Sequence, residues 1–133
     1  MGAPMVAFAR IDDRSIELHC SIYEPDSVVV LDPTLVNIVY VFGGLREGGS
    51  MLINSSRPLD LKRSFYRVPA SKIAMKILGK DITNTAMIWA LLKVEPVIKL
   101  DALSGVIGDR FSGKLAELNR EVVRAAYRGV ERA

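Results

Sequence analysis

Three groups of polar residues stand where predicted strands end. Asp32 follows residues 28–31, Asn54 with Ser55 and Ser56 closes residues 51–54, and Ser71 follows residues 65–68. In α/β folds, ligands bind in the crevice outside the carboxyl ends of the strands. The pattern therefore predicts a small-ligand crevice at Asp32, Asn54 and Ser71. The alternative interpretation is that these side chains only end strands and cap helices.

A second candidate site is the start of a predicted helix that is capped by Thr83 or Asn84 and runs to about Val94. The backbone N–H groups and the dipole of a helix N-terminus favour an anion. Asn84 and Thr85, together with Asp32, are therefore the candidate cofactor-binding residues. The alternative is that Asn84 is a plain N-cap that needs no ligand.

No set of residues predicts catalysis or a metal site. The chain has one histidine, His19, and one cysteine, Cys20, whereas structural zinc takes four N or S ligands. The carboxylates Asp12 and Asp13 are predicted at a turn tip, where pKa values stay ordinary. The glycine-rich residues 43–49 precede a strand, whereas a phosphate-cradling loop follows one. We therefore assign no catalytic residue and no metal ligand.

The elements that position these residues follow from periodicity. Apolar side chains alternate over 5–11 and 16–22 around a turn at 12–15, which predicts a β-hairpin. Buried strands are predicted at 28–31, 51–54 and 65–68, a helix at 34–42, and a short helix or turn at 59–64. Further helices are predicted at 72–78 with Ser71 as N-cap, at 84–94, at 102–110 capped by Asp101, and after Gly113 to about 131. This order predicts a single α/β domain over residues 1–133, a three-layer α/β/α sandwich whose mixed sheet combines parallel strands with an antiparallel hairpin.

Composition limits the function classes. The chain has 133 residues, of which 50% are hydrophobic and 25% charged, which excludes disorder. Its longest apolar run, Ala86 to Leu92, is far shorter than the about 18 residues of a membrane span. One cysteine and no secretory signal favour the cytoplasm. Because the run from Ala86 to Leu92 is apolar all round as a helix, it is expected either in the domain core or against a partner.

Basic residues gather in one stretch. Residues 57–80 contain Arg57, Lys62, Arg63, Arg67, Lys72, Lys76 and Lys80 against one acid, Asp60. Such a stretch either faces an anionic partner or is a solvated surface. No nucleic-acid-binding motif accompanies it.

Several phrases, in this order, resemble the gamma subunit of 2-oxoacid:ferredoxin oxidoreductases, in the pyruvate group. They are GAPMVAFARI at 2–11, YEPD at 23–26, VVVLDPTL at 28–35, GLREGG at 44–49, ITNTAM at 82–87 and RFSGKLAELN at 110–119. The resemblance implies a non-catalytic subunit of a complex that converts a 2-oxo acid and coenzyme A to acyl-CoA and carbon dioxide while reducing ferredoxin. It implies alpha, beta and delta subunits as partners, and ferredoxin indirectly. Thiamine diphosphate, iron–sulfur clusters and coenzyme A are then expected in the assembled complex and no cofactor in this chain.

The resemblance covers the C-terminal part of that subunit. The family's gamma chains begin roughly 50 residues earlier, with a first strand and a Gly-x-Gly-Gly-x-Gly loop suited to phosphates. The expectation is that this segment is missing here and that the isolated chain could hide its apolar surface in a homodimer. The alternative function is a stand-alone α/β module that binds coenzyme A or another nucleotide in the crevice at the strand ends.

Overall fold

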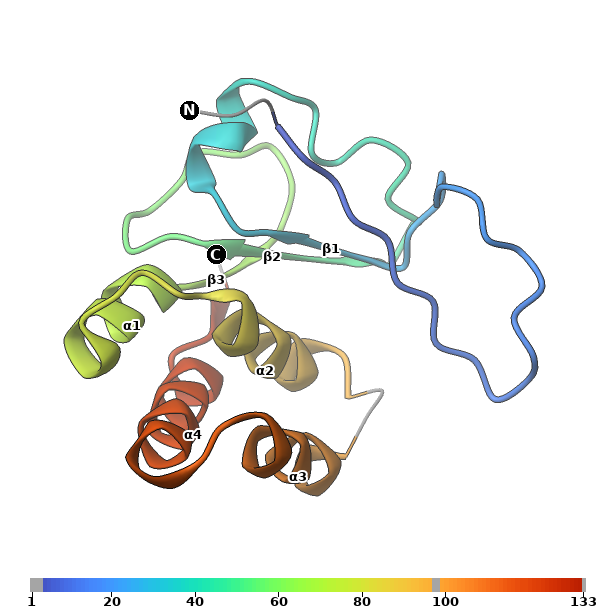
Figure 1. Cartoon of the computed structure of the whole chain (residues 1–133). Coiled ribbons are helices and arrows are strands. Elements are labelled where there is room, and N and C mark those ends of the chain that lie inside the picture. Colours follow the sequence, from blue (N-terminus) through green and yellow to red (C-terminus); the bar gives the residue numbers. More distant parts are fainter. Residues whose placement is uncertain (1–3, 97–98, 133) are drawn as a thin grey trace.

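The computed structural model describes residues 4–96 and 99–132. Its elements are, in order, β1 (Ser27–Val30), the 3-10 helix η1 (Pro33–Asn37), β2 (Ser50–Asn54), β3 (Tyr66–Val68), α1 (Ala70–Leu78), α2 (Asn84–Val94), α3 (Leu100–Arg110), α4 (Gly113–Arg128) and β4 (Glu131–Arg132). The sheet lies between the four α-helices on one side and η1 with long loops on the other (Figure 1).

The four strands form one mixed sheet in the order β1-β2-β3-β4. The β1–β2 and β2–β3 pairs are parallel, and the β3–β4 pair is antiparallel. The three predicted buried strands are therefore present within a residue or two of their expected limits. The predicted α/β class with a mixed sheet is confirmed.

The antiparallel pair lies elsewhere than predicted. Residues 4–22, all of which the structure describes, contain no strand, so the hairpin over 5–22 is not formed. The segment is instead an extended loop that leaves the body beside β1 and returns to it (Figure 1). Its legs are bridged by Arg10, whose Nη1 donates to the Cys20 carbonyl at 2.6 Å. Apolar side chains of this alternating pattern stay exposed to solvent. Val6 is 76% exposed and Leu18 is 67% exposed.

The helical layer is built around α2. Small residues on α2, Ala86 and Ala90, are fully buried and let it approach the sheet residues Leu52 and Val68 closely. Its Trp89 packs against Ile107 of α3 and Val123 of α4. The core interpretation of this apolar helix is therefore right for most of it, although Ile88 stays 49% exposed. No helix among the described residues is long and apolar enough to cross a membrane.

The opposite face of the sheet is covered without α-helices. Met51 and Ile53 alternate with Leu52 along β2, so they pack on this face with Phe42 and Phe65. The helix predicted over 34–42 is reduced to η1, and residues 59–64 form bends and coil. β-branched residues such as Val36 and Ile38 disfavour a longer helix. The third layer is therefore thin, made of one 3-10 turn and loops.

Candidate functional site

Asn54 and Ser71 meet at the carboxyl ends of the strands, as the crevice prediction required. Asn54 is 3% exposed and ends β2. Its Nδ2 donates to the Ser71 Oγ at 2.8 Å and to the Leu31 carbonyl at 2.9 Å. Its Oδ1 accepts from the Ser71 backbone N–H at 3.1 Å. Both amide hydrogens are thus used to fasten β1, β2 and α1 together, which makes this cluster a structural joint.

Two predicted helix caps are wrong. Pro69, not Ser71, is the N-cap of α1, and the Ser71 side chain turns to Asn54 instead. Likewise α3 begins at Leu100 with Lys99 as N-cap, which places Asp101 inside the first turn. In both cases the helix starts earlier than the local pattern indicates. The first residues of a helix can adopt its backbone conformation because their N–H groups need no intrahelical acceptor.

Asp32 is committed to its own loop. Its Oδ1 accepts from the Thr34 backbone N–H at 3.0 Å and from the Thr34 hydroxyl at 2.7 Å, which caps η1. These donors hold the pKa of Asp32 below its ordinary value, so the carboxylate stays ionised near neutral pH. A fixed negative charge opposes the phosphates of coenzyme A, so the role left to Asp32 toward such a ligand is to accept from a hydroxyl.

Asn84 and Thr85 lie in the first turn of α2. Thr83 is the N-cap but makes no side-chain capping bond, and the exposed Asn84 accepts from the Thr85 backbone N–H at 3.0 Å. Of the two predicted caps, Thr83 is therefore the right one, and the plain N-cap interpretation of Asn84 is wrong. η1 and α2 cover opposite faces of the sheet (Figure 1). Asp32, which caps η1, therefore lies on the other side of the sheet from Asn84 and Thr85. The assignment of Asn84, Thr85 and Asp32 to a cofactor stays a prediction.

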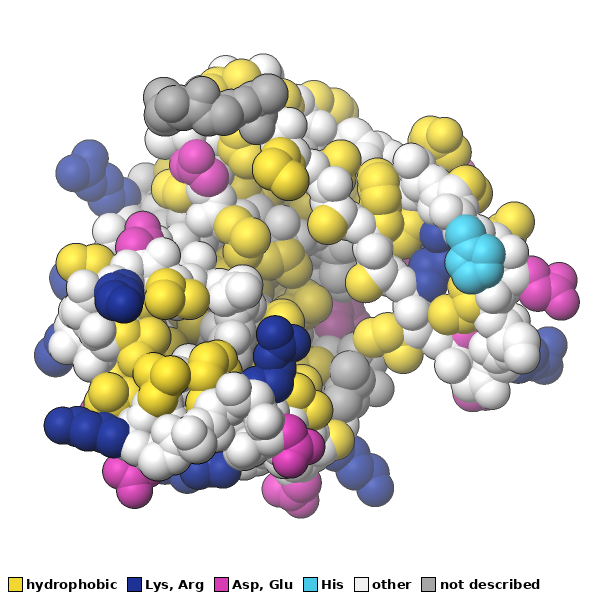
Figure 2. Space-filling model, in the orientation of Figure 1, with side chains coloured by type: hydrophobic (Ala, Val, Ile, Leu, Met, Phe, Trp, Pro, Cys, Tyr) yellow, Lys and Arg dark blue, Asp and Glu magenta, His cyan; other side chains and the backbone are white. Residues whose placement is uncertain are grey.

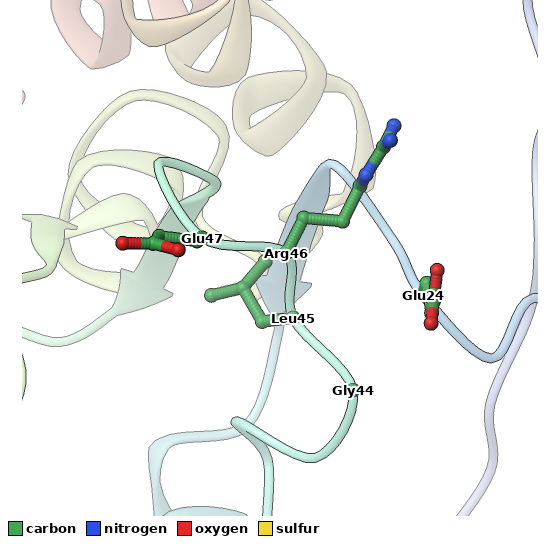
Figure 3. Close-up of a pocket in the computed structure, with 5 residues that line it drawn as sticks. All are labelled: Glu24, Gly44, Leu45, Arg46 and Glu47. Carbon is green, nitrogen blue, oxygen red and sulfur yellow. The ribbon is translucent and has the colours of Figure 1, made fainter.

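The glycine-rich loop lines an open pocket of about 330 Å³. Its walls are Glu24, Gly44, Leu45, Arg46 and Glu47. The Arg46 and Glu47 side chains point in different directions and do not converge with Glu24 on one point (Figure 3). Arg46 donates to Asp26 at 2.8 Å, an ion pair that raises the pKa of its guanidinium. The pocket therefore lacks a focused binding centre.

The glycines of this loop have a packing role that the sequence alone did not reveal. Gly44 has φ +77°, and a Cβ there would lie 1.9 Å from the Tyr23 carbonyl oxygen. A Cβ at Gly49 would lie 2.8 Å from both the Arg46 and the Asp26 carbonyl oxygens. The loop is pinned to residues 23–26 by bonds from the Arg46 N–H to Pro25 and from the Ser50 N–H to Asp26. One glycine of each pair, Gly44 and Gly49, allows this close backbone approach.

The donor set does not fit a metal cluster. Among the described residues, no group of three His, Cys, Asp or Glu could hold a metal ion. An iron–sulfur cluster is held by several cysteine thiolates, and the sequence has Cys20 alone, which is exposed.

The sequence matches the family described as pyruvate ferredoxin/flavodoxin oxidoreductase over residues 1–129. It is 43% identical over 127 residues to the pyruvate synthase subunit PorC of Methanocaldococcus jannaschii, covering 95% of this chain and 71% of that one. It is 41% identical to the common subunit gamma of the pyruvate/ketoisovalerate oxidoreductases of Pyrococcus furiosus, covering 98% and 75%. It is 34% identical to the gamma subunit of the NADH-dependent phenylglyoxylate dehydrogenase of Aromatoleum evansii, with the same coverage.

The fold has a solved counterpart. The crystal structure of the pyruvate oxidoreductase subunit PORC from Thermotoga maritima superposes with a TM-score of 0.77 at 28% identity. The match covers 84% of this chain and 67% of that one. Sequence and structure agree along nearly the whole chain, which therefore belongs to the pyruvate ferredoxin/flavodoxin oxidoreductase family.

Proposed function

We propose that this chain is a non-catalytic subunit of a pyruvate:ferredoxin oxidoreductase. Such a complex converts a 2-oxo acid and coenzyme A to acyl-CoA and carbon dioxide while it reduces ferredoxin. The observation that carries the proposal is the family match over residues 1–129, to relatives that are themselves named as subunits. Pyruvate, ketoisovalerate and phenylglyoxylate in the relatives' names are all 2-oxo acids, which supports that substrate class here.

The chemistry of the described residues supports a role without catalysis. Asn54 is the most buried polar side chain at the strand ends, and it donates both amide hydrogens, to Leu31 and Ser71. The Asp32 Oδ1 accepts from Thr34. No nucleophile, base and orienting group are joined by the hydrogen bonds of the described residues. A stand-alone module that binds a nucleotide in this crevice would need Asn54 to release its partners first.

Exposed apolar side chains support the subunit role. The loop over residues 4–23 exposes several of them in a pattern typical of half-buried strands. They are Met5, Val6, Phe8, Ile11, Ile16, Leu18 and Tyr23. So large an apolar surface is typical of a protein interface. We propose that other subunits of the complex cover it.

The proposed partners are alpha, beta and delta subunits, with ferredoxin as an indirect partner and the cytoplasm as the location. Thiamine diphosphate, which supplies decarboxylation chemistry, and the iron–sulfur clusters would then belong to the other subunits. The part of this chain would be to hold the assembly together by its apolar and charged surfaces.

The test is reconstitution. The chain is co-expressed without oxygen with alpha, beta and delta subunits from the same organism. The molar mass of the purified assembly is then measured by light scattering. We expect the chain to join the complex, and pyruvate-dependent ferredoxin reduction with coenzyme A to require the complex. Turnover by the isolated chain, or separation of the chain from the other subunits, would contradict the proposal.

A further inference from the structure

One side of the helical layer is strongly basic. Lys72 and Lys76 lie one helical turn apart on α1, and Lys80 follows the end of that helix. Arg124 and Arg128 lie one turn apart at the end of α4. All five side chains are exposed, and we call them the basic face. Lys and Arg side chains stand along the margin of the molecule over α1 and α4 (Figure 2).

Tertiary packing brings these two basic segments together. α1 and α4 share one core cluster, in which Ala70 and Ile73 of α1 meet Val122 and Ala126 of α4. The contact reaches the end of α4, where a Cβ at Gly129 would lie 3.6 Å from the Ile73 Cδ1. The basic last turns of α4 thus lie beside α1, although more than 40 residues separate the two segments in sequence.

The charges of the basic face are not neutralised within the fold. In the described part of the chain, the ion pairs are Arg46–Asp26 and Arg67–Glu131, and neither includes a residue of the basic face. The helix α1 contains no acidic residue. The nearest acids along the chain are Asp81 after Lys80, Glu121 one turn before Arg124, and Glu131, which is paired with Arg67. Like charges held close together repel one another. An anionic surface that covers the basic face would offset this repulsion and be bound favourably.

An exposed apolar residue lies beside the lysines of the basic face. Met75 directly precedes Lys76 on α1 and is 52% exposed. Ala70 and Ala74 are buried on the other side of the helix. Cations beside a flexible thioether fit a protein surface, which offers carboxylates together with apolar side chains. It does not fit a nucleic acid as well, because Phe65 is buried and Tyr66 half-buried, leaving no exposed aromatic ring for stacking in that stretch.

We propose that the basic face is the docking surface for an acidic face of another subunit of the oxidoreductase complex. The proposal rests on the proposed function and adds to it the location and chemistry of one contact. Opposite charges steer association and fix the orientation of the two partners. The apolar loop over residues 4–23 lies elsewhere on the molecule and would make a separate contact.

The experiment measures binding of this chain to the complex assembled without it. The variant is Lys72→Glu/Lys76→Glu. The matched control is Lys99→Glu/Lys114→Glu, which reverses two exposed lysines outside the basic face. Circular dichroism and urea unfolding establish that each variant is folded. Dissociation constants are compared at low salt and at several hundred millimolar salt, where charges are screened within about 3–8 Å.

We expect the α1 variant to bind about tenfold more weakly or worse at low salt, with a smaller difference at high salt. The control is expected within about threefold of the wild-type chain. Equal losses in both variants, or wild-type binding by the α1 variant, would overturn the docking surface while the proposed function stands. If the wild-type chain binds duplex DNA more tightly than the other subunits, and the α1 variant loses this DNA binding, the proposal of a protein partner is overturned. If the wild-type chain does not join the complex, the proposed function fails and the inference fails with it.

Discussion

Asn54 and Ser71 form a reciprocal pair at the end of β2. The Asn54 Nδ2 donates to the Ser71 Oγ at 2.8 Å, and the Ser71 backbone N–H donates back to the Asn54 Oδ1 at 3.1 Å. The same Nδ2 donates to the Leu31 carbonyl at the end of β1. One buried amide therefore joins two parallel strands to the first turn of α1.

Replacing this amide should destabilise the fold. We expect Asn54→Ala to lower the free energy of unfolding by about 2–4 kcal/mol, because it leaves buried donors and acceptors unpaired. Ser71→Ala, which removes one hydroxyl, should cost about 1 kcal/mol. Urea unfolding measures both. Equal costs for the two variants would show that Asn54 has no special role.

The glycine-rich loop offers a matched pair of substitutions. Gly44 and Gly48 have nearly the same positive φ, +77° and +78°, but a Cβ at Gly48 meets nothing within 4 Å. Gly48→Ala should therefore cost only the left-handed backbone strain, about 1 kcal/mol. Gly44→Ala adds a clash with the Tyr23 carbonyl and should cost at least about 2 kcal/mol more. Thermal unfolding tests this, and equal melting temperatures would refute the close approach.

Asp32 predicts a defined pH dependence. The Thr34 donors lower the pKa of Asp32 in the folded state below the value of 3.8 that it has when unfolded. The unfolded state then binds more protons in that range, so the stabilisation is complete above pH 3.8 and is lost as pH falls through the folded pKa. Asp32→Asn should be less stable than wild type at pH 6, and the gap should close as the pH falls below 3.8. Urea midpoints across this range measure the difference, and a constant gap would contradict it.

Asn84 and Thr85 can be tested for contact with coenzyme A. Asn84→Ala removes the bond to the Thr85 N–H and should cost under about 1 kcal/mol, because the site is exposed. If the pair contacts the ligand, Asn84→Ala/Thr85→Ala in the assembled complex raises the KM for coenzyme A. The KM for the 2-oxo acid should then be unchanged and serves as the internal control. If the KM values for both substrates are unchanged, Asn84 and Thr85 do not contact coenzyme A and have only a structural role.

The apolar loop should matter for assembly and not for folding. Val6→Asp/Leu18→Asp changes two largely exposed side chains, so the free energy of unfolding of the isolated chain should shift by under about 0.5 kcal/mol. Incorporation into the complex should fall strongly, because two charges would enter an apolar interface. Leu115→Asp, on the exposed side of α4, is the comparison. Normal incorporation of the loop variant would place the interface elsewhere.

Much of the fold could be predicted from the sequence by itself because its signals are local. The β-branched run at Val28–Val30 predicts β1, and Gly79, with φ +73°, ends α1 as a left-handed C-cap. The all-apolar stretch after Asn84 predicts α2 and its burial. The ordered phrases of the sequence identify the family, because motif order is a property of the chain.

The tertiary structure decided what depends on distant partners. β4 has two residues and no pattern of its own, and it exists because Glu131 pairs with Arg67 of β3. Residues 5–22 have a hairpin pattern and no ladder, since alternation indicates which face is apolar but not what covers it. Asn54 reads as a ligand-binding residue until its partners on β1 and α1 are known. The basic face arises only where α4 ends beside α1, because charges far apart in sequence add up only after packing brings them together.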